Sequence, residues 1–382
     1  MPMVDPRTLH VDCRWFRADR PCDPHKRSGV TCPTCTQYDP IRRRILVVKL
    51  AAVGDVLRTT ALLPAIHAAF PGAKLTWLTA PSARALFAGN PLVDEVLTHG
   101  DARTAARLAV ETFDVVLCPD ADPDAAVLAA AARGRQRRGF SMDERGVVVP
   151  LGAGADVWYR MGLSDAQKRA NTTTYQTLVA RVLDLDPTAV AEPILEPSAE
   201  DRSHAQAFAA GLAFRGPWIG LNSGAGGRWT RKQWTLEHQI AFLTLATDRG
   251  YGVMLLGGPE ERERHAQLVA ATPGRAVVDA GTDNGYRRFA ALVDLCAVVV
   301  TGDTFALHVA TARRRHVVAL FGPTSSAEIE LYGRGEKIVP TDLTCLCCYL
   351  PTCDVDPHCQ QRILPSVVLA AVERGLGALA TR

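Results

Sequence analysis

Residues 43–79, RRILVVKLAAVGDVLRTTALLPAIHAAFPGAKLTWLT, are the stretch that most restricts how this chain can fold. An apolar run leads through a glycine turn into an apolar helical segment, and a second apolar run follows. This is the pattern of a βαβ unit, whose strands are parallel and covered on both faces. The sequence therefore predicts an α/β fold with a parallel sheet.

A second series of the same kind begins at GPWIGLNSGAGGRWTRKQW and continues through VMLLGG, AVVVTGDTFALHVATA and HVVALFGPT. Because 382 residues exceed the usual span of one hydrophobic core, the two series predict two doubly wound, Rossmann-like domains facing each other across a cleft. The acidic, proline-rich segment at residues 186–202 is the predicted linker. The predicted parts are a cysteine-rich N-terminal extension (1–40), an N-terminal domain (41–190), a C-terminal domain (203–340), and a cysteine finger with a terminal helix (341–382).

The charge balance and the apolar runs limit the setting in which the chain works. A net charge of +3 argues against a dedicated nucleic-acid-binding protein, and the short basic runs are typical of solvated turns and helix ends. No apolar run is long enough to cross a bilayer, and the N-terminal sequence lacks the apolar core of a signal peptide. We therefore expect a cytoplasmic protein, whose thiols stay reduced.

Asp55 directly follows Gly54 at the end of the first predicted strand, the edge where doubly wound folds bind ligands. A carboxylate in that place can act as a general base that accepts a proton from a hydroxyl group. It can equally cap the following helix by bonding its free N–H groups. Position alone does not separate the two interpretations.

Two further turns between a strand and a helix carry polar residues. The loop NSGAGGRWTRKQW brings three glycines close to Arg228 and Lys232, a combination typical of phosphate binding, although its spacing matches no standard nucleotide fingerprint. In TGDTFALHVATA, Asp303 and Thr304 begin a helix, and His308 follows one turn later, where a diphosphate can bind. The alternatives are a loop that only turns the chain and a histidine that is only packed.

These motifs, together with NPLVDEVL at residues 90–97 and VMLLGGPEE, resemble glycosyltransferase family 9, the ADP-heptose lipopolysaccharide heptosyltransferases, over residues 45–363. The resemblance implies a GT-B fold and a metal-independent, inverting transfer from an ADP-activated sugar. Asp55 would deprotonate the acceptor hydroxyl, and Lys232 would neutralise the departing diphosphate. The other matched positions implied to bind substrates are Gly54, Thr59, Thr60, Ser223, Gly224, Arg228, Asp303, Thr304 and His308.

Phe305 departs from the family pattern, because a glycine is common at this position. A bulky residue here would block close backbone approach to the phosphate, which implies a changed donor pose or a different sugar. ADP-heptose is the expected donor, and the acceptor is a lipopolysaccharide core sugar, another surface glycan, a lipid-linked glycan or a protein. Peripheral association with the inner face of the membrane would suit such acceptors. The alternatives are another nucleotide-activated sugar, a nucleotide-sugar epimerase, or a non-catalytic metal-binding protein that binds nucleotide sugars.

Nine of the 11 cysteines lie near the two ends of the chain. Cys345, Cys348, Cys353 and Cys359 supply four thiolates suited to a structural zinc or iron ion. Family members often end in a similar finger, and the branch that modifies autotransporter proteins carries iron there. A second possible set, with His25 in reserve and a reduced, metal-free segment as the alternative, consists of Cys13, Cys22, Cys32 and Cys35.

Overall fold

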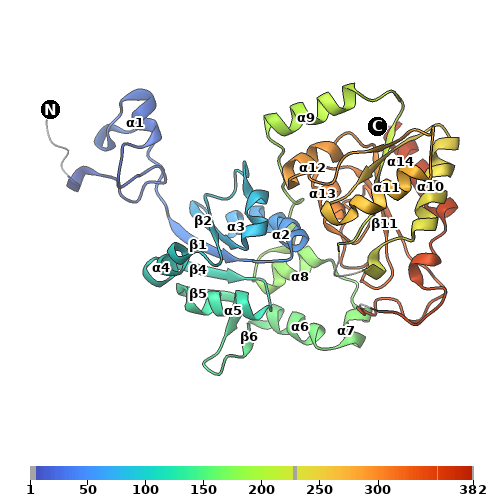
Figure 1. Cartoon of the computed structure of the whole chain (residues 1–382). Helices are drawn as coiled ribbons and strands as arrows, with labels where there is room; N and C mark the ends of the chain where they lie inside the picture. The colour runs from blue at the N-terminus through green and yellow to red at the C-terminus, as the bar shows by residue number, and fades with distance from the viewer. Residues whose placement is uncertain (1–5, 227–229, 351, 381–382) are drawn as a thin grey trace.

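The first domain is built on a six-stranded sheet in the order β3-β2-β1-β4-β5-β6 (Figure 1). In this computed structural model, residues 6–226, 230–350 and 352–380 are described. The strands of the first domain are β1 (Arg43–Val48), β2 (Ala73–Thr79), β3 (Glu95–Thr98), β4 (Thr112–Cys118), β5 (Arg133–Met142) and β6 (Val148–Leu151). The first five are parallel, whereas β6 runs antiparallel to β5 because the connection between them is too short for a crossover.

Helices cover both faces of this sheet, which explains why consecutive residues of β1 and β2 are buried rather than every second one. The register pairs Ile45 with Leu75 on one side and with Val115 on the other, and all three are buried in one core. The helices of the first domain are α2 (Val53–Thr59), α3 (Leu63–Ala69), α4 (Ala102–Val110), α5 (Pro123–Ala131), α6 (Ala153–Gly162), α7 (Asp165–Ala170) and α8 (Tyr175–Val182).

The second domain repeats the design with a fully parallel sheet in the order β12-β11-β10-β7-β8-β9. Its strands are β7 (Trp218–Asn222), β8 (Gly252–Leu256), β9 (Val277–Asp279), β10 (Val298–Gly302), β11 (His316–Leu320) and β12 (Gly335–Ile338). Its helices are α9 (Ala199–Ala210), α10 (Leu236–Asp248), α11 (Arg262–Ala270), α12 (Tyr286–Val293), α13 (Phe305–Ala312) and α14 (Pro365–Ala380). The prediction of two doubly wound domains is thus confirmed.

The domains meet where α2 of the first packs against α13 of the second. A Cβ atom at Gly54 would lie only 2.9 Å from Cδ2 of His308, so the crossing requires a glycine here. Helix α9 begins with a capping box between Ser198 and Asp201 and packs on α12. In the described part of the chain no helix is both long and apolar enough to span a membrane.

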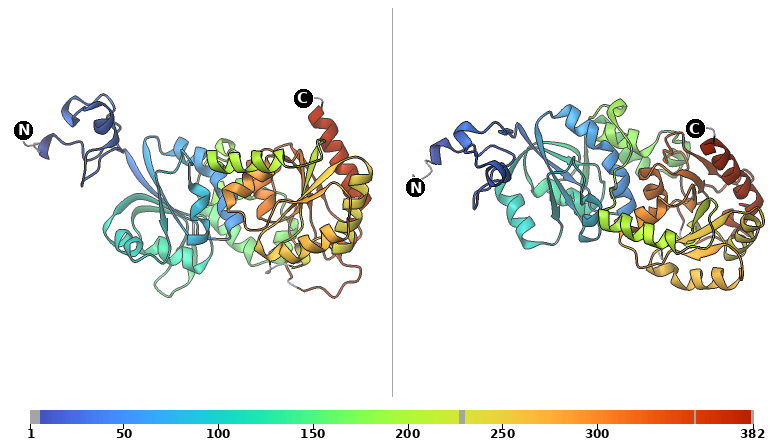
Figure 2. Two further views of the ribbon diagram at one scale, coloured as in Figure 1. Left: turned by 45° about the horizontal axis from the view of Figure 1, so that its top comes forward. Right: turned by 90° about the horizontal axis from the view of Figure 1, so that it is seen from above.

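Two cysteine-rich segments lie outside the sheets. The head, residues 6–40, contains the short helix α1 (Asp23–Ser28) and extends from the first domain on the side away from the second (Figure 2). The finger, residues 345–359, follows β12 and precedes the turn Cys359–Gln361 and the terminal helix.

Candidate active site

Asp55 lies in the first turn of α2, which begins after Ala52, so the helix-capping interpretation is wrong. Its Oδ1 pairs with Nη2 of Arg58 at 2.8 Å, and 36% of its side chain is exposed. Partial burial opposes ionisation, but the charges of Arg58 and Lys49 outweigh it and lower the pKa of Asp55 to about 2. The carboxylate is therefore ionised at neutral pH and able to accept a proton.

Arg58, Tyr175 and Lys49, which the sequence motifs did not indicate, keep Asp55 ionised. The Arg58 guanidinium lies 3.5 Å from the centroid of the Tyr175 ring, which fixes its position by a cation–π contact. Lys49, almost fully buried, donates to Oδ2 of Asp120 at 2.8 Å and to the Ala51 carbonyl at 2.6 Å. The spacing of three residues between Asp55 and Arg58 was the signal available in the sequence.

Thr59 and Thr60, expected to hold the acceptor, are buried and use their hydroxyls inside the protein. Thr59 donates to the Asp55 carbonyl at 2.6 Å and lies 2.9 Å from the hydroxyl of Tyr175. Thr60 donates to the Leu57 carbonyl and accepts from the amide of Ile194. Each hydroxyl bonds within the protein in this arrangement, and acceptor contact by Thr59 and Thr60 stays a prediction.

Across the domain boundary, Lys232 and Asp303 form a second charge pair. Lys232 Nζ lies 2.9 Å from Oδ2 of Asp303 and donates to the Asp303 carbonyl at 3.2 Å. Burial opposes ionisation of Asp303, but Lys232, His308 and Arg58 together lower its pKa. The structure therefore brings together two residues that stand 71 positions apart in the chain.

His308 links the two pairs, because it packs against Gly54 while its electrostatic partners come from both domains. Burial and the charge of Arg58 lower its pKa to about 4, against the opposite effect of Asp303 and Asp55. The imidazole is therefore neutral at physiological pH. We call Asp55, Arg58, Lys232, Asp303 and His308 the interdomain charge cluster.

Beside this cluster lies a cavity of about 790 Å³ between the two domains, bounded by Val53 on one side and Phe305 on the other. Its wall includes Asn222, which donates to the Thr304 hydroxyl at 3.2 Å and to the Gly224 carbonyl at 2.8 Å. The remaining residues around it all come from the second domain: Gly224, Ala225, Gly226, Gly257, Gly258, Pro259, Glu260, Glu261, Asn284, Tyr286, Phe289, Thr304 and Ala306.

The predicted phosphate loop already contains an anion that the sequence analysis missed. Glu261 accepts hydrogen bonds from the amides of Gly258 at 2.8 Å and Gly226 at 3.4 Å, and a Cβ atom at Gly224 would overlap its carboxylate. Ser223 is buried beneath this loop, and Arg228 lies outside the described residues. The glycines thus give a carboxylate close access to backbone N–H groups, as phosphate binding also requires.

Phe305 is the first residue of α13 and lines the cavity. Its ring packs against Tyr286 and Phe289, with centroids 4.9 Å and 6.0 Å apart. The residue that departs from the family pattern therefore contributes an aromatic wall beside Thr304.

The finger packs directly on the loop that follows β11. Cys345, Cys348, Cys353 and Cys359 line one small cavity with Gly322, where a Cβ atom would overlap the Cys359 sulfur. Within residues 6–226, 230–350 and 352–380, no three side chains of His, Cys, Asp or Glu are placed so that they could share a metal ion. The metal sites therefore stay predictions.

A chain of contacts runs from the finger to the charge cluster. The Tyr349 hydroxyl donates to Oε1 of Glu328 at 3.2 Å, and the Glu328 carbonyl accepts from the Tyr175 amide at 2.9 Å. The ring of Tyr175 in turn contacts the guanidinium group of Arg58, which pairs with Asp55. Although the finger is distant from Asp55 in sequence, the fold connects them through Tyr349, Glu328, Tyr175 and Arg58.

Comparison with known proteins identifies the family. Residues 102–358 match the model of glycosyltransferase family 9 (heptosyltransferase). The chain belongs to this family. The matched residues contain Lys232, Asp303 and His308, whereas Asp55 precedes them.

Curated relatives and solved structures agree with this assignment. Lipopolysaccharide heptosyltransferase 1 of Pseudomonas aeruginosa is 26% identical over 339 residues, which cover 84% of this chain and 90% of that protein. The structure of Escherichia coli ADP-heptose lipopolysaccharide heptosyltransferase II superposes with a TM-score of 0.67 at 20% identity, over 88% of this chain and 99% of that one. The iron-containing dodecameric glycosyltransferase TibC of enterotoxigenic E. coli gives a TM-score of 0.52 at 12% identity, over 89% and 77%. The family 9 protein described here is thus a glycosyltransferase with the GT-B fold.

Proposed function

We propose that this family 9 glycosyltransferase transfers heptose from ADP-heptose to a hydroxyl group of a lipopolysaccharide core sugar, with another surface glycan or a protein as the alternative acceptor. The names of its curated relatives support the donor and the acceptor class. The observation that carries the proposal is the interdomain charge cluster, which places an ionised, partly exposed carboxylate beside a cavity that both domains line. We further propose that it acts in the cytoplasm, at the inner face of the membrane.

In the proposed reaction, the acceptor oxygen attacks the anomeric carbon from the face opposite the diphosphate. The bond from that carbon to the diphosphate oxygen breaks, and its electron pair leaves with ADP. The acceptor hydroxyl becomes far more acidic as its new bond forms, so that Asp55 can take the proton in spite of its low pKa. Arg58 holds the carboxylate in place through Oδ1, which assigns Oδ2 to the acceptor.

On the donor side, Lys232 neutralises the negative charge that develops on the leaving diphosphate. Lys232 is held by Asp303, so its ammonium group is oriented before the donor arrives. The neutral His308 and the hydroxyl of Thr304 lie on α13 and its N-terminal turn, where a phosphate oxygen would meet N–H groups and hydroxyls.

The four finger cysteines have the donor set for a structural iron or zinc ion, because all four line one cavity. A metal there would tie the finger to the loop after β11. We propose a structural role, since the charges assigned to the reaction come from Asp55 and Lys232.

A donor screen tests the proposal. The purified chain is incubated with ADP-heptose, GDP-sugars or UDP-sugars, with and without heptose-deficient lipopolysaccharide, and the products are identified by mass spectrometry. We expect transfer from ADP-heptose only when acceptor is present. Conversion of the donor without acceptor would indicate an epimerase, and transfer from another donor would overturn the choice of heptose.

The variant Asp55→Asn tests the base. We expect turnover to fall by about 10²- to 10⁴-fold with ADP binding retained. Asp122→Asn is the matched control, because it makes the same change in the same domain at the N-cap of α5, where asparagine also caps well. Equal turnover of the two variants would show that Asp55 is not the base.

A further inference from the structure

The head has no hydrophobic core that could hold its shape. Among its described residues only Pro24 is buried, and regular structure is limited to the six residues of α1 and two 3-10 turns. A segment of about 35 residues is shorter than the roughly 40 residues below which domains usually need a disulfide or a metal. The fold of the head therefore depends on something other than apolar burial.

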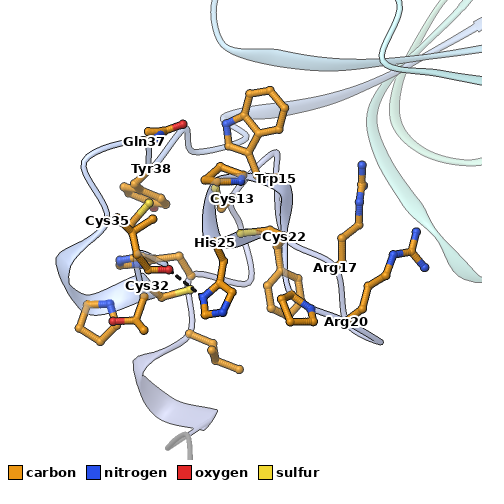
Figure 3. Close-up of a pocket in the computed structure, with 18 of the residues that line it drawn as sticks. Cys13, Trp15, Arg17, Arg20, Cys22, His25, Cys32, Cys35, Gln37 and Tyr38 are labelled. Carbon is orange, nitrogen blue, oxygen red and sulfur yellow. Dashed lines mark hydrogen bonds between the residues drawn. The ribbon is translucent and has the colours of Figure 1, made fainter. Parts of the chain in front are cut away.

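The head instead surrounds a cavity of about 300 Å³ with cysteines (Figure 3). Cys13, Cys22, Cys32 and Cys35 all line this cavity, and none of the four forms a disulfide. Cys22 stands immediately before α1, and the turn from Cys32 to Cys35 is closed by a bond from the Cys35 amide to the Cys32 carbonyl at 3.3 Å. A turn of this C-x-x-C type presents two thiols on one side of the backbone, as zinc sites commonly use.

His25 enters the same cavity and has a fixed orientation. Its Nδ1 lies 2.9 Å from the Val30 carbonyl, which can only accept a hydrogen bond, so Nδ1 carries the proton. The lone pair of Nε2 is then available to a thiol or an ion. Support of this kind from a carbonyl is typical of histidines beside metal ions.

We propose that Cys13, Cys22, Cys32 and Cys35 bind one zinc ion as thiolates and that this ion folds the head. Each thiol releases its proton to solvent as the ion binds. In the arrangement described by the structure, the four side chains line the cavity without converging on one point, so binding includes closure of the head around zinc. The inference is independent of the sugar that the enzyme transfers.

Closure would also orient the contact between the head and the first domain. Arg14 directly follows Cys13; it pairs with Asp94, donates to the Ala73 carbonyl at 2.9 Å, and pairs with Asp39 at 3.0 Å. The backbone of Cys13 forms an isolated antiparallel β-bridge with Pro40 at the base of the head. A metal ligand therefore stands next to the residue that fastens the head to the strand edge.

The test measures metal content and head folding in the full-length chain. Zinc is determined by mass spectrometry in the wild type, in Cys32→Ser/Cys35→Ser and in Cys345→Ser/Cys348→Ser, the last of which leaves the head intact. We expect the head variant to lose about one equivalent relative to the wild type, and the finger variant to keep that equivalent. Cobalt(II) added to the finger variant should give the thiolate charge-transfer and visible bands of a tetrahedral site.

Limited trypsin digestion supplies a second measurement that does not depend on activity. Cleavage after Arg17, Lys26 and Arg27 should be slow in zinc-loaded wild type and at least about tenfold faster after chelation, since folding and binding are coupled. Equal zinc in the wild type and the head variant, iron in place of zinc, or cleavage indifferent to chelation would overturn the proposal; ADP binding by the head variant would show that the two main domains are intact.

Discussion

The finger and the head each gather four cysteines in a short segment, yet they contact the rest of the molecule in different ways. The finger packs on the loop after β11 and reaches Asp55 through Tyr349, Glu328, Tyr175 and Arg58. The head is fastened by Arg14 to the outer strands of the first domain, far from the second domain (Figure 1). The cysteine pattern thus predicts a metal site in each segment, whereas the contacts of the segment with its neighbours determine which part of the protein it can affect.

The first prediction tests whether the contact between the two domains keeps His308 neutral. Because the pKa of His308 is about 4 in the folded protein and 6.5 ordinarily, the unfolded chain takes up this proton first as the pH falls. The free energy of unfolding therefore contains the full contribution of neutral His308 above pH 6.5, and this contribution decreases by about 3 kcal/mol as the pH falls towards 4. Urea unfolding of wild type and His308→Gln at several pH values measures it, and the variant should show a shallower dependence. Equal slopes would show that His308 is not held neutral by the domain contact.

The second prediction compares the two cysteine segments directly. Cys345→Ser/Cys348→Ser should lower kcat by about tenfold, because the loop that carries Glu328 loses its support. Cys32→Ser/Cys35→Ser should leave kcat within about twofold, since no contact of the head reaches the charge cluster in the described structure. Steady-state kinetics with both variants provides the measurement. A larger loss in the head variant would reverse the comparison.

The third prediction concerns Tyr349, which we regard as a positioning residue. Tyr349→Phe removes the hydroxyl that donates to Glu328, a neighbour whose pKa is raised by burial although Arg58 acts in the opposite direction. The loss of one such hydrogen bond, about 1 kcal/mol, corresponds to roughly a fivefold fall in kcat with KM for the donor unchanged. A change in KM alone would indicate that Tyr349 acts on donor binding. Tyr38→Phe, in the head, is the control and should leave both constants unchanged.

The smallest expected effect belongs to the contact between the head and the first domain. Arg14→Ala removes ion pairs with Asp39 and Asp94 that are partly exposed, so its cost should be about 0.5–1 kcal/mol. Hydrogen exchange should increase around Ala73 and Asp94 while turnover stays the same. Unchanged exchange there would show that Arg14 does not fasten the head.

The sequence was sufficient to predict the two parallel sheets, because buried strands and crossover helices follow from local apolar patterns. It also placed Asp55, Lys232, Asp303 and His308 at strand ends, where a doubly wound fold brings polar residues together. Tyr175 and Glu328 could not be predicted because their importance comes from contacts between segments more than 100 residues apart, whereas the spacing of Arg58 from Asp55 was visible in the sequence. The internal hydrogen bonds of Thr59 and Thr60 could not be predicted, because a sequence motif does not show which way a hydroxyl points.

The position of Glu261 has one more consequence for the glycine-rich loop. Its carboxylate already takes the N–H groups of Gly226 and Gly258. A diphosphate that enters this loop meets a resident anion rather than vacant donors, so donor binding there is an exchange of one negative group for another. The selectivity of the loop then rests on the difference between two anions, and a ligand that cannot displace the carboxylate is rejected however well the rest of it fits.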